Sequence, residues 1–151
     1  MKYIFIYKGS LPSKANYKEI GYRRINGELK PFIRNKKQVL IFQNEAIYQL
    51  HKQILSYGYE KFPLKNLIKI KILFFLKRNF EKRDLDNLEK FLFDVLEKAN
   101  IIKNDAQIVK KEAIKLKYKE EGFFIEIENI KNLRISKQIE NSLKIFQEKE
   151  I

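Results

Sequence analysis

Residues 67–99 read LIKIKILFFLKRNFEKRDLDNLEKFLFDVLEKA, and this stretch joins two segments of different periodicity. Residues 67–76 alternate isoleucine with lysine and then become wholly apolar, which predicts a central strand of a sheet. Residues 86–99 carry apolar side chains at helical spacing, which predicts an amphipathic helix. Its apolar stripe consists of Leu88, Phe91, Leu92, Val95, Leu96 and Ala99. The chain therefore passes from a buried strand into a helix over residues 77–85.

The flanking segments extend this unit into a small α+β domain. Residues 21–37 are basic and contain Gly27 and Pro31, which predicts a hairpin or an irregular arm. The length of 151 residues fits one domain, so we expect residues 1–151 to form a single small mixed β-sheet packed with helices. Further strands are predicted at residues 1–7, 107–118 and 123–130, and further helices at residues 44–57 and from Ser136 onward.

The charge of the chain points to a polyanionic partner. Lysine and arginine number 32 against 19 acidic residues, which gives a net charge of +13 and a pI near 9.7. A surplus of that size in a small domain favours nucleic acid first and an anionic membrane second. The longest apolar run, residues 72–76, is far below the ~20 residues that cross a bilayer. We therefore expect a soluble, cytoplasmic protein that does not enter a membrane.

Several classes of site are excluded by composition. The chain has no cysteine, which excludes a disulfide scaffold, a cysteine-ligated zinc site and a thiol nucleophile. His51 is the single histidine, so metal sites that need two histidines are excluded and a Ser-His triad is disfavoured. Carboxylates are left as the main candidates for metal binding.

Acidic residues gather in one segment of this basic chain. Residues 1–40 carry ten basic and two acidic side chains, a net of +8, and residues 61–83 carry eight and one, a net of +7. Residues 84–105 reverse the sign, with six acids against three lysines, a net of −3. An acidic island between basic flanks indicates a metal-binding or catalytic centre in a nucleic-acid-binding surface. The alternative is a solvated helix face.

Asp84 and Asp86 stand at the junction of strand and helix. If residues 84–86 are extended, both carboxylates point to one side and Leu85 points into the core. A divalent cation relieves the repulsion between such carboxylates, and Mg²⁺ is held by one or two of them together with waters and phosphate oxygens. The alternative is structural: Asp86 and Glu89 form a capping box, and Asp84 pairs with Arg83 or Lys82.

Two further charged residues bear on this junction. Lys90 lies one helical turn beyond Asp86, on the face opposite the apolar stripe, where its ammonium group can reach a phosphate. Asp105 follows the helix. A right-handed crossover places Asp105 at the start of the next strand, at the far end of the sheet from Asp84. The three aspartates then meet only if the strand pairing is antiparallel or if a second subunit contributes one of them.

Residues 83–109, RDLDNLEKFLFDVLEKANIIKNDAQIV, resemble the signature of the RusA family of Holliday-junction resolvases. The shared pattern is Asp-x-Asp-Asn-x-x-Lys, an Asp-x-Leu in the following helix, a helix end with one or two apolar residues, and then an Asp pair before Ile or Val. About seven defined positions match over these residues. A weaker resemblance covers residues 12–16 (PSKAN), which are similar to a Pro-Ser-x-Asn element with one residue extra.

The resemblance implies a small α+β fold, a homodimer and a metal-dependent endodeoxyribonuclease that uses Mg²⁺, with Mn²⁺ as a substitute. By position, Asp84, Asp86 and Asp105 correspond to the three essential carboxylates, which are catalytic and hold the metal. Lys90 corresponds to the catalytic lysine, and Asn87 and Asp94 correspond to supporting positions. The sequence departs from the pattern at Asn104, where the family has the first acid of the Asp pair, and at Asn100, where it usually has Gly.

We therefore expect an enzyme that resolves Holliday junctions by paired phosphodiester cleavage in DNA recombination and repair. Two alternatives stay open, a non-catalytic basic nucleic-acid-binding protein and a nuclease without junction preference. Phe93, an apolar residue on the polar side of the 86–99 helix, suggests either a subunit contact or a merely exposed side chain. The predicted DNA contacts are Lys14, Asn16, Arg23, Arg24, Lys36, Lys37 and Arg83.

Overall fold

A four-stranded mixed sheet forms the centre of the molecule in the computed structural model, which describes residues 1–13, 18–131 and 133–149. The strands lie in the order β1-β6-β4-β5, and β4 pairs in parallel only with β5, while the β1–β6 and β6–β4 pairs are antiparallel. The predicted α+β fold with a mixed sheet is therefore confirmed. The strands are β1 (Lys2–Lys8), β4 (Leu67–Leu76), β5 (Ile108–Lys117) and β6 (Gly122–Ile130).

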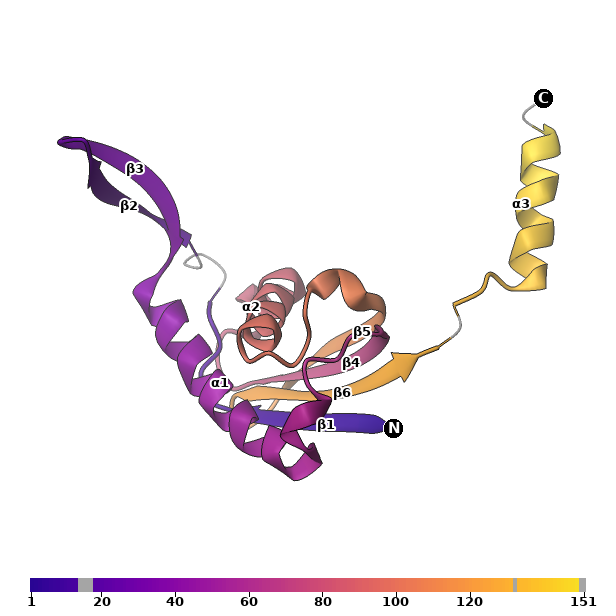
Figure 1. Ribbon diagram of the computed structural model, residues 1–151, viewed down its shortest axis with the longest axis horizontal. Coiled ribbons are helices and arrows are strands. Elements are labelled where there is room, and N and C mark those ends of the chain that lie inside the picture. Colours follow the sequence, from indigo (N-terminus) through magenta and orange to yellow (C-terminus); the bar gives the residue numbers. More distant parts are fainter. Residues whose placement is uncertain (14–17, 132, 150–151) are drawn as a thin grey trace.

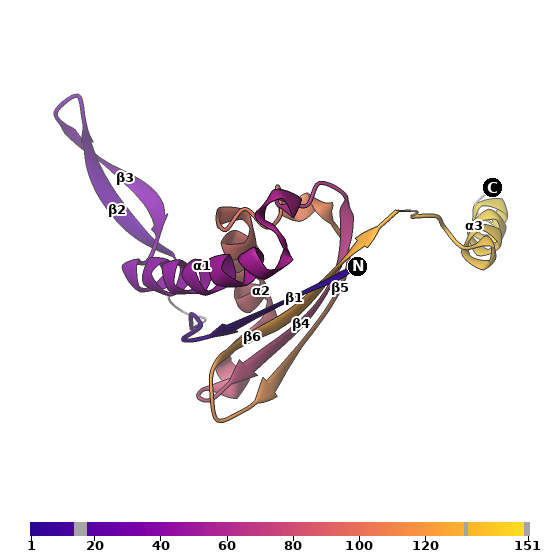
Figure 2. The same cartoon turned by 60° about the horizontal axis from the view of Figure 1, so that its bottom comes forward.

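Helices α1 (Lys37–Tyr57) and α2 (Leu85–Lys98) cover one face of this sheet (Figure 2). Alternation along the strands sends every second side chain into the core beneath them, so β4 buries Ile68, Ile70, Ile72, Phe74 and Leu76. The predicted stripe of α2 is buried on the same side. The opposite face of the sheet has no helix packed on it among the described residues (Figure 2).

The α2 helix connects two neighbouring parallel strands. The chain leaves β4 at Leu76, passes through a short turn at Phe80–Lys82, runs along α2 and enters β5 at Ile108. Residues Ile68 and Ile108 lie side by side in the sheet, so β5 begins at the end where β4 begins. The crossover therefore places the residues before α2 and the residues after it one helix length apart.

The free edge of β1 is paired with side chains of α1. Gln49, Gln53 and Tyr57 each donate to a β1 carbonyl and accept from the N–H of the same residue, over distances of 2.6–3.0 Å. Four helical residues rise about 6 Å and two strand residues about 6.7 Å, so the two repeats match closely. Their partners, in the same order, are Lys8, Ile6 and Ile4.

Two arms extend from this body (Figure 1). One arm is the hairpin of β2 (Lys18–Ile25) and β3 (Glu28–Asn35), which confirms the hairpin predicted there. The other arm is helix α3 (Lys137–Lys149), at whose start the Ser136 Oγ accepts from the Ile139 N–H at 3.2 Å, as the predicted cap requires. Among the described residues, no helix is both long and apolar enough to cross a membrane.

Helix boundaries differ from the prediction in two places. Helix α1 begins at Lys37 instead of residue 44, and Lys36 before it makes no capping hydrogen bond with its side chain. The residues in between read KQVLIFQ, a run rich in β-branched and aromatic side chains that is also compatible with a strand. Helix α2 begins at Leu85, so residues 84–86 are not extended as expected.

Candidate active site

Asp84 and Asp86 flank the start of α2. Asp84 is the last extended residue, Leu85 is the first helical residue, and Asp86 lies in the first turn. The extended arrangement that we expected is therefore wrong, because the helix begins one residue before Asp86. Both carboxylates are nevertheless exposed, and Leu85 between them packs against the core. The start of the helix also favours negative charge, because its backbone N–H groups point outward there.

The capping-box alternative for Asp86 and Glu89 is wrong. The residue that precedes the helix is Asp84, and its side chain makes no capping hydrogen bond. Glu89 points to the sheet, is 8% exposed, and accepts from Lys111 Nζ on β5 at 2.6 Å. Neither Asp84 nor Asp86 therefore serves as a helix cap through its side chain.

The remaining motif residues follow along α2. Asp86, Lys90 and Asp94 are spaced four residues apart, which places them on one side of the helix. Lys90 is exposed and Asp94 is half-buried, and Asn87 is half-buried in the first turn. The structure thus brings Asp84, Asp86 and Lys90 together around the first two turns of α2.

Asp105 lies beyond the other end of the helix. It begins a short 3₁₀ turn, and its N–H donates to Glu97 Oε1, in the last turn of α2, at 2.8 Å. The 14 residues of α2 span about 21 Å, so Asp105 is that far from the Asp84–Asp86 pair along the helix. The separation that the crossover rule predicts is confirmed. Within one chain, the three aspartates do not meet.

Asn104 caps the turn that carries Asp105. Its Oδ1 accepts from the Ala106 N–H at 2.8 Å, and Gln107 Oε1 accepts from the Asn104 N–H at 3.0 Å, which completes a capping box. Gln107 Nε2 donates in turn to the carbonyl of Leu64 at 2.7 Å, just before β4. The asparagine at this departure from the family pattern therefore fixes the backbone beside Asp105.

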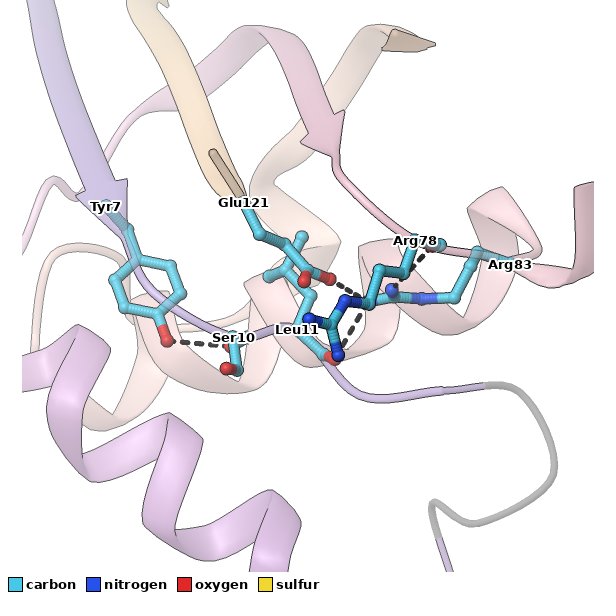
Figure 3. Close-up of polar contacts among 6 residues, drawn as sticks. All are labelled: Tyr7, Ser10, Leu11, Arg78, Arg83 and Glu121. Atoms are coloured by element: carbon cyan, nitrogen blue, oxygen red, sulfur yellow. Dashed lines mark hydrogen bonds and ion pairs between the residues drawn. The ribbon is translucent and has the colours of Figure 1, made fainter. Parts of the chain in front are cut away.

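A buried ion pair supports the other end of α2 (Figure 3). Arg83, which directly precedes Asp84, is 5% exposed, and its guanidinium pairs with Glu121 on the turn before β6. The same group donates to the carbonyls of Leu11 at 2.8 Å and Arg78 at 3.3 Å. Because the guanidinium is buried among these partners, we assign Arg83 a structural role in place of the predicted DNA contact.

Tyr7, in β1 near Glu121, is a further structural residue that sequence patterns did not single out. Its hydroxyl donates to the carbonyl of Ser10 at 2.7 Å (Figure 3), and burial, with smaller contributions from Glu45 and Glu121, raises the pKa of Tyr7. The hydroxyl therefore stays protonated and keeps donating. Only glycine fits at position 122, because its φ of +155° and the nearby Tyr7 carbonyl leave no room for a side chain.

The family model of endodeoxyribonuclease RusA matches residues 26–128, which hold both ends of α2 and the strands on either side of it. The chain belongs to the RusA family. Family membership makes it an endodeoxyribonuclease, an enzyme whose partner is DNA. The RusA match leaves out β1, β2 and α3, which are part of this chain's own structure. None of the curated proteins matches the chain.

Two of the DNA contacts predicted for this RusA-family chain, Arg23 and Arg24, lie on the hairpin. Arg23 faces Lys30 and lies over the ring of Phe32 at 5.0 Å, whereas Arg24 faces Leu29 on the other side of the hairpin. The two arginines therefore cannot contact one stretch of DNA backbone from the same face. Lys36 and Lys37 lie where β3 meets α1, and Lys14 and Asn16 lie outside the described residues.

Phe93 is not the fully exposed apolar residue that its place on the polar side of the helix suggests. It is half-buried and packs against the core, and Lys111 Nζ lies 5.9 Å from its ring centre. A contact of Phe93 with a second subunit, like the homodimer itself, stays a prediction.

The RusA family implies a divalent metal, and the exposed Asp84–Asp86 pair fits one by its donor chemistry. Mg²⁺ prefers oxygen ligands and is usually held by one or two carboxylates while it keeps several waters. Among the described residues, no group of three or more metal-ligating side chains lies close enough together to hold an ion. One chain thus brings together two of the three carboxylates that are predicted to hold the metal.

Proposed function

We propose that this RusA-family endodeoxyribonuclease is a Mg²⁺-dependent, homodimeric resolvase that cuts Holliday junctions in paired strands during DNA recombination and repair. The observation that carries the proposal is the exposed acidic pair at the start of α2, with Lys90 one turn beyond it, in a chain of net charge +13. Neither carboxylate forms the helix cap that was one structural alternative for the pair. The basic surface supplies the attraction to a polyanion.

Each residue of the site has a separate task in this proposal. Asp84 and Asp86 hold the metal, which when bound activates water and stabilises charge on the phosphate. Lys90 neutralises the charge that builds on the phosphate oxygens as the bond breaks. Asp94, four residues further on, orients Lys90, and Asn87 positions the first turn of the helix.

A homodimer would complete the site. Because α2 separates Asp105 from the acidic pair by about 21 Å, Asp105 can join the pair only from a second chain. In our proposal, Asp84 and Asp86 of one subunit therefore act with Asp105 of the partner subunit. A two-fold dimer then has two equivalent sites, as two cuts in symmetry-related strands require.

The proposal is tested by incubating the protein with a synthetic four-way junction or with linear duplex of the same sequence, with Mg²⁺, with Mn²⁺ and with chelator. We expect metal-dependent, symmetric cuts in the junction and little cutting of the duplex. Equal cutting of both substrates would indicate a nuclease without junction preference. Tight binding without any cutting would indicate a non-catalytic binding protein. Light scattering should give twice the chain mass of 18.3 kDa.

A further inference from the structure

An open hollow of about 480 Å³ lies at the end of the sheet that adjoins the start of α2. The last residue of β1, the first residues after β4 and the turn between β5 and β6 converge on it. Four cations and two acids line it, namely Lys8, Lys77, Arg78, Lys119, Glu120 and Glu121. None of these cations was among the DNA contacts predicted from the sequence, because they come from three distant segments.

The two acids of the hollow are already engaged by cations. Glu121 pairs with the buried Arg83, and Glu120 lies 3.9 Å from Lys8 Nζ. Lys77, Arg78 and Lys119 form no ion pair with any carboxylate in the described part of the chain. The hollow therefore keeps a positive surplus that favours an anion.

The backbone around the hollow is held in place before any ligand arrives. The Gly9 N–H donates to the Glu121 carbonyl at 2.9 Å, and the Tyr7 hydroxyl donates to the Ser10 carbonyl at 2.7 Å. Arg83 also donates to the carbonyl of Arg78 on the rim (Figure 3). A rigid wall lowers the entropic cost of binding a ligand.

The hollow is connected to the candidate active site through Arg83. The guanidinium of Arg83 contacts both Glu121 and Arg78 in the lining, and the next residue along the chain is Asp84. A DNA strand whose scissile phosphate lies at Asp84 and Asp86 can therefore place a neighbouring phosphate over the hollow. Lysine and arginine neutralise such phosphates without reading the sequence.

We propose that this hollow is a binding site for backbone phosphate of the DNA strand that enters the active site. The inference rests on the proposed function, since it requires DNA as the substrate. It adds a site that positions the strand and is separate from the acidic pair and from the hairpin. Lys77 and Arg78 provide its main contacts, because they lie at the end of β4 that leads to Asp84.

The test compares two double variants that remove the same charge from the two ends of β4. Lys77→Gln with Arg78→Gln alters the hollow, and Lys69→Gln with Lys71→Gln alters the other half of β4, where Glu126 and Glu128 lie beside the lysines. Affinity for a labelled four-way junction is measured in chelator at several salt concentrations. We expect the affinity of the hollow variant to fall at least tenfold, and its log–log salt slope to decrease by about 0.9 for each phosphate that the variant no longer neutralises. The control should keep the slope of the unaltered chain.

Equal reductions in affinity for both double variants would overturn the proposal, because net charge alone would then explain them. If the unaltered chain binds no DNA, the proposed function fails together with this site. If it binds DNA and the hollow variant behaves as the control does, only the hollow is refuted. Thermal unfolding confirms that each variant is folded, and Lys119→Gln alone should give a smaller reduction in the same direction.

A second measurement localises the phosphate that the hollow binds. Neutral methylphosphonates are placed one at a time along the cleaved strand, and the affinity is measured for the unaltered chain and for the hollow variant. At the contacted phosphate, the replacement should weaken binding by the unaltered chain at least threefold and leave binding by the hollow variant unchanged. Equal penalties for both proteins at every position would refute the site.

Discussion

The two ends of α2 hold their aspartates in different ways. At the start of the helix, Asp84 and Asp86 are exposed, and the residue before them is fixed by the buried Arg83–Glu121 pair. At the far end, Asn104 caps the turn that carries Asp105, and the Asp105 N–H donates to Glu97 in the last turn of α2. One end is supported by charge in a basic environment and the other by local capping.

In our proposal, this difference means that one subunit provides two half-sites. The acidic pair lies next to cations that attract DNA, whereas Asp105 is fixed in place but belongs to no cluster of three metal-ligating side chains among the described residues. In the proposed dimer, each end of α2 supplies its part of a site that the second chain completes. Substitutions at each end of α2, alone and then combined across a dimer, can test this interpretation.

The largest effect is expected at the acidic pair. Asp84→Asn and Asp86→Asn should each lower junction cleavage by more than a hundredfold, since even outer partners of a metal site cost about 10- to 100-fold. Junction binding should persist or strengthen, because a negative charge near the phosphates is removed. Single-turnover cleavage and binding in chelator measure the two properties. Cleavage by either variant at the unaltered rate would show that the pair does not hold the metal.

Removal of the buried arginine should destabilise the start of α2. Arg83→Met leaves Glu121 without its partner and should lower the free energy of unfolding by about 3–5 kcal/mol, the usual cost of breaking a buried ion pair. Arg34→Met is the matched control, because its pair with Glu19 is exposed and worth about 1 kcal/mol at most. Urea unfolding measures both. Equal destabilisation by the two substitutions would mean that the buried pair gives no special support.

Subunit mixing tests whether the two ends act together across a dimer. Asp84→Asn and Asp105→Asn chains should each be inactive alone. After they are unfolded and refolded together, half of the dimers contain one of each chain, and each mixed dimer has one intact composite site. Activity should then return to about a quarter of the unaltered level, with nicks in place of paired cuts. No recovery, although mixed dimers form, would place the whole site within one chain.

The smallest effect is expected at the cap beside Asp105. Asn104→Ala removes the acceptor for the Ala106 N–H and should lower the free energy of unfolding by about 1 kcal/mol. Asn104→Asp, which restores the acid of the family pattern, keeps the cap and should leave stability close to that of the unaltered chain. Chemical unfolding distinguishes the two variants. If Asp105 is functional, Asn104→Ala should also slow cleavage, whereas Asn104→Asp should not.

Periodicity and spacing predicted the central part of the fold from sequence. The strand at residues 67–76 was predicted with the bounds that the structure has, and the next helix was predicted within a residue at each end. Both carry long, regular patterns. Asn100, which stands where the family usually has Gly, has φ of +61° in the left-handed region beyond the helix. The crossover rule also placed Asp105 away from Asp84, although the motif alone suggests that they meet.

Contacts between distant segments of the chain could not be predicted from the sequence. Nothing in the pattern around Arg83 indicates that it would be buried, because its partners Leu11 and Glu121 come from other parts of the chain. Exposure was therefore assumed for a charged side chain that tertiary packing encloses. The early start of α1 was missed for a local reason, since residues 37–43 have no capping signal and their composition also suits a strand.

The pairing of α1 with β1 affects how the protein behaves at high concentration. An unpaired strand edge is a template for adding strands of other molecules, which leads to fibrils. Here Gln49, Gln53 and Tyr57 occupy the outward N–H and carbonyl groups of β1, so that edge offers no template. The opposite edge strand, β5, has the sequence IVKKEAIKLK, whose lysines repel a second copy. Self-association through either of these edges is therefore disfavoured.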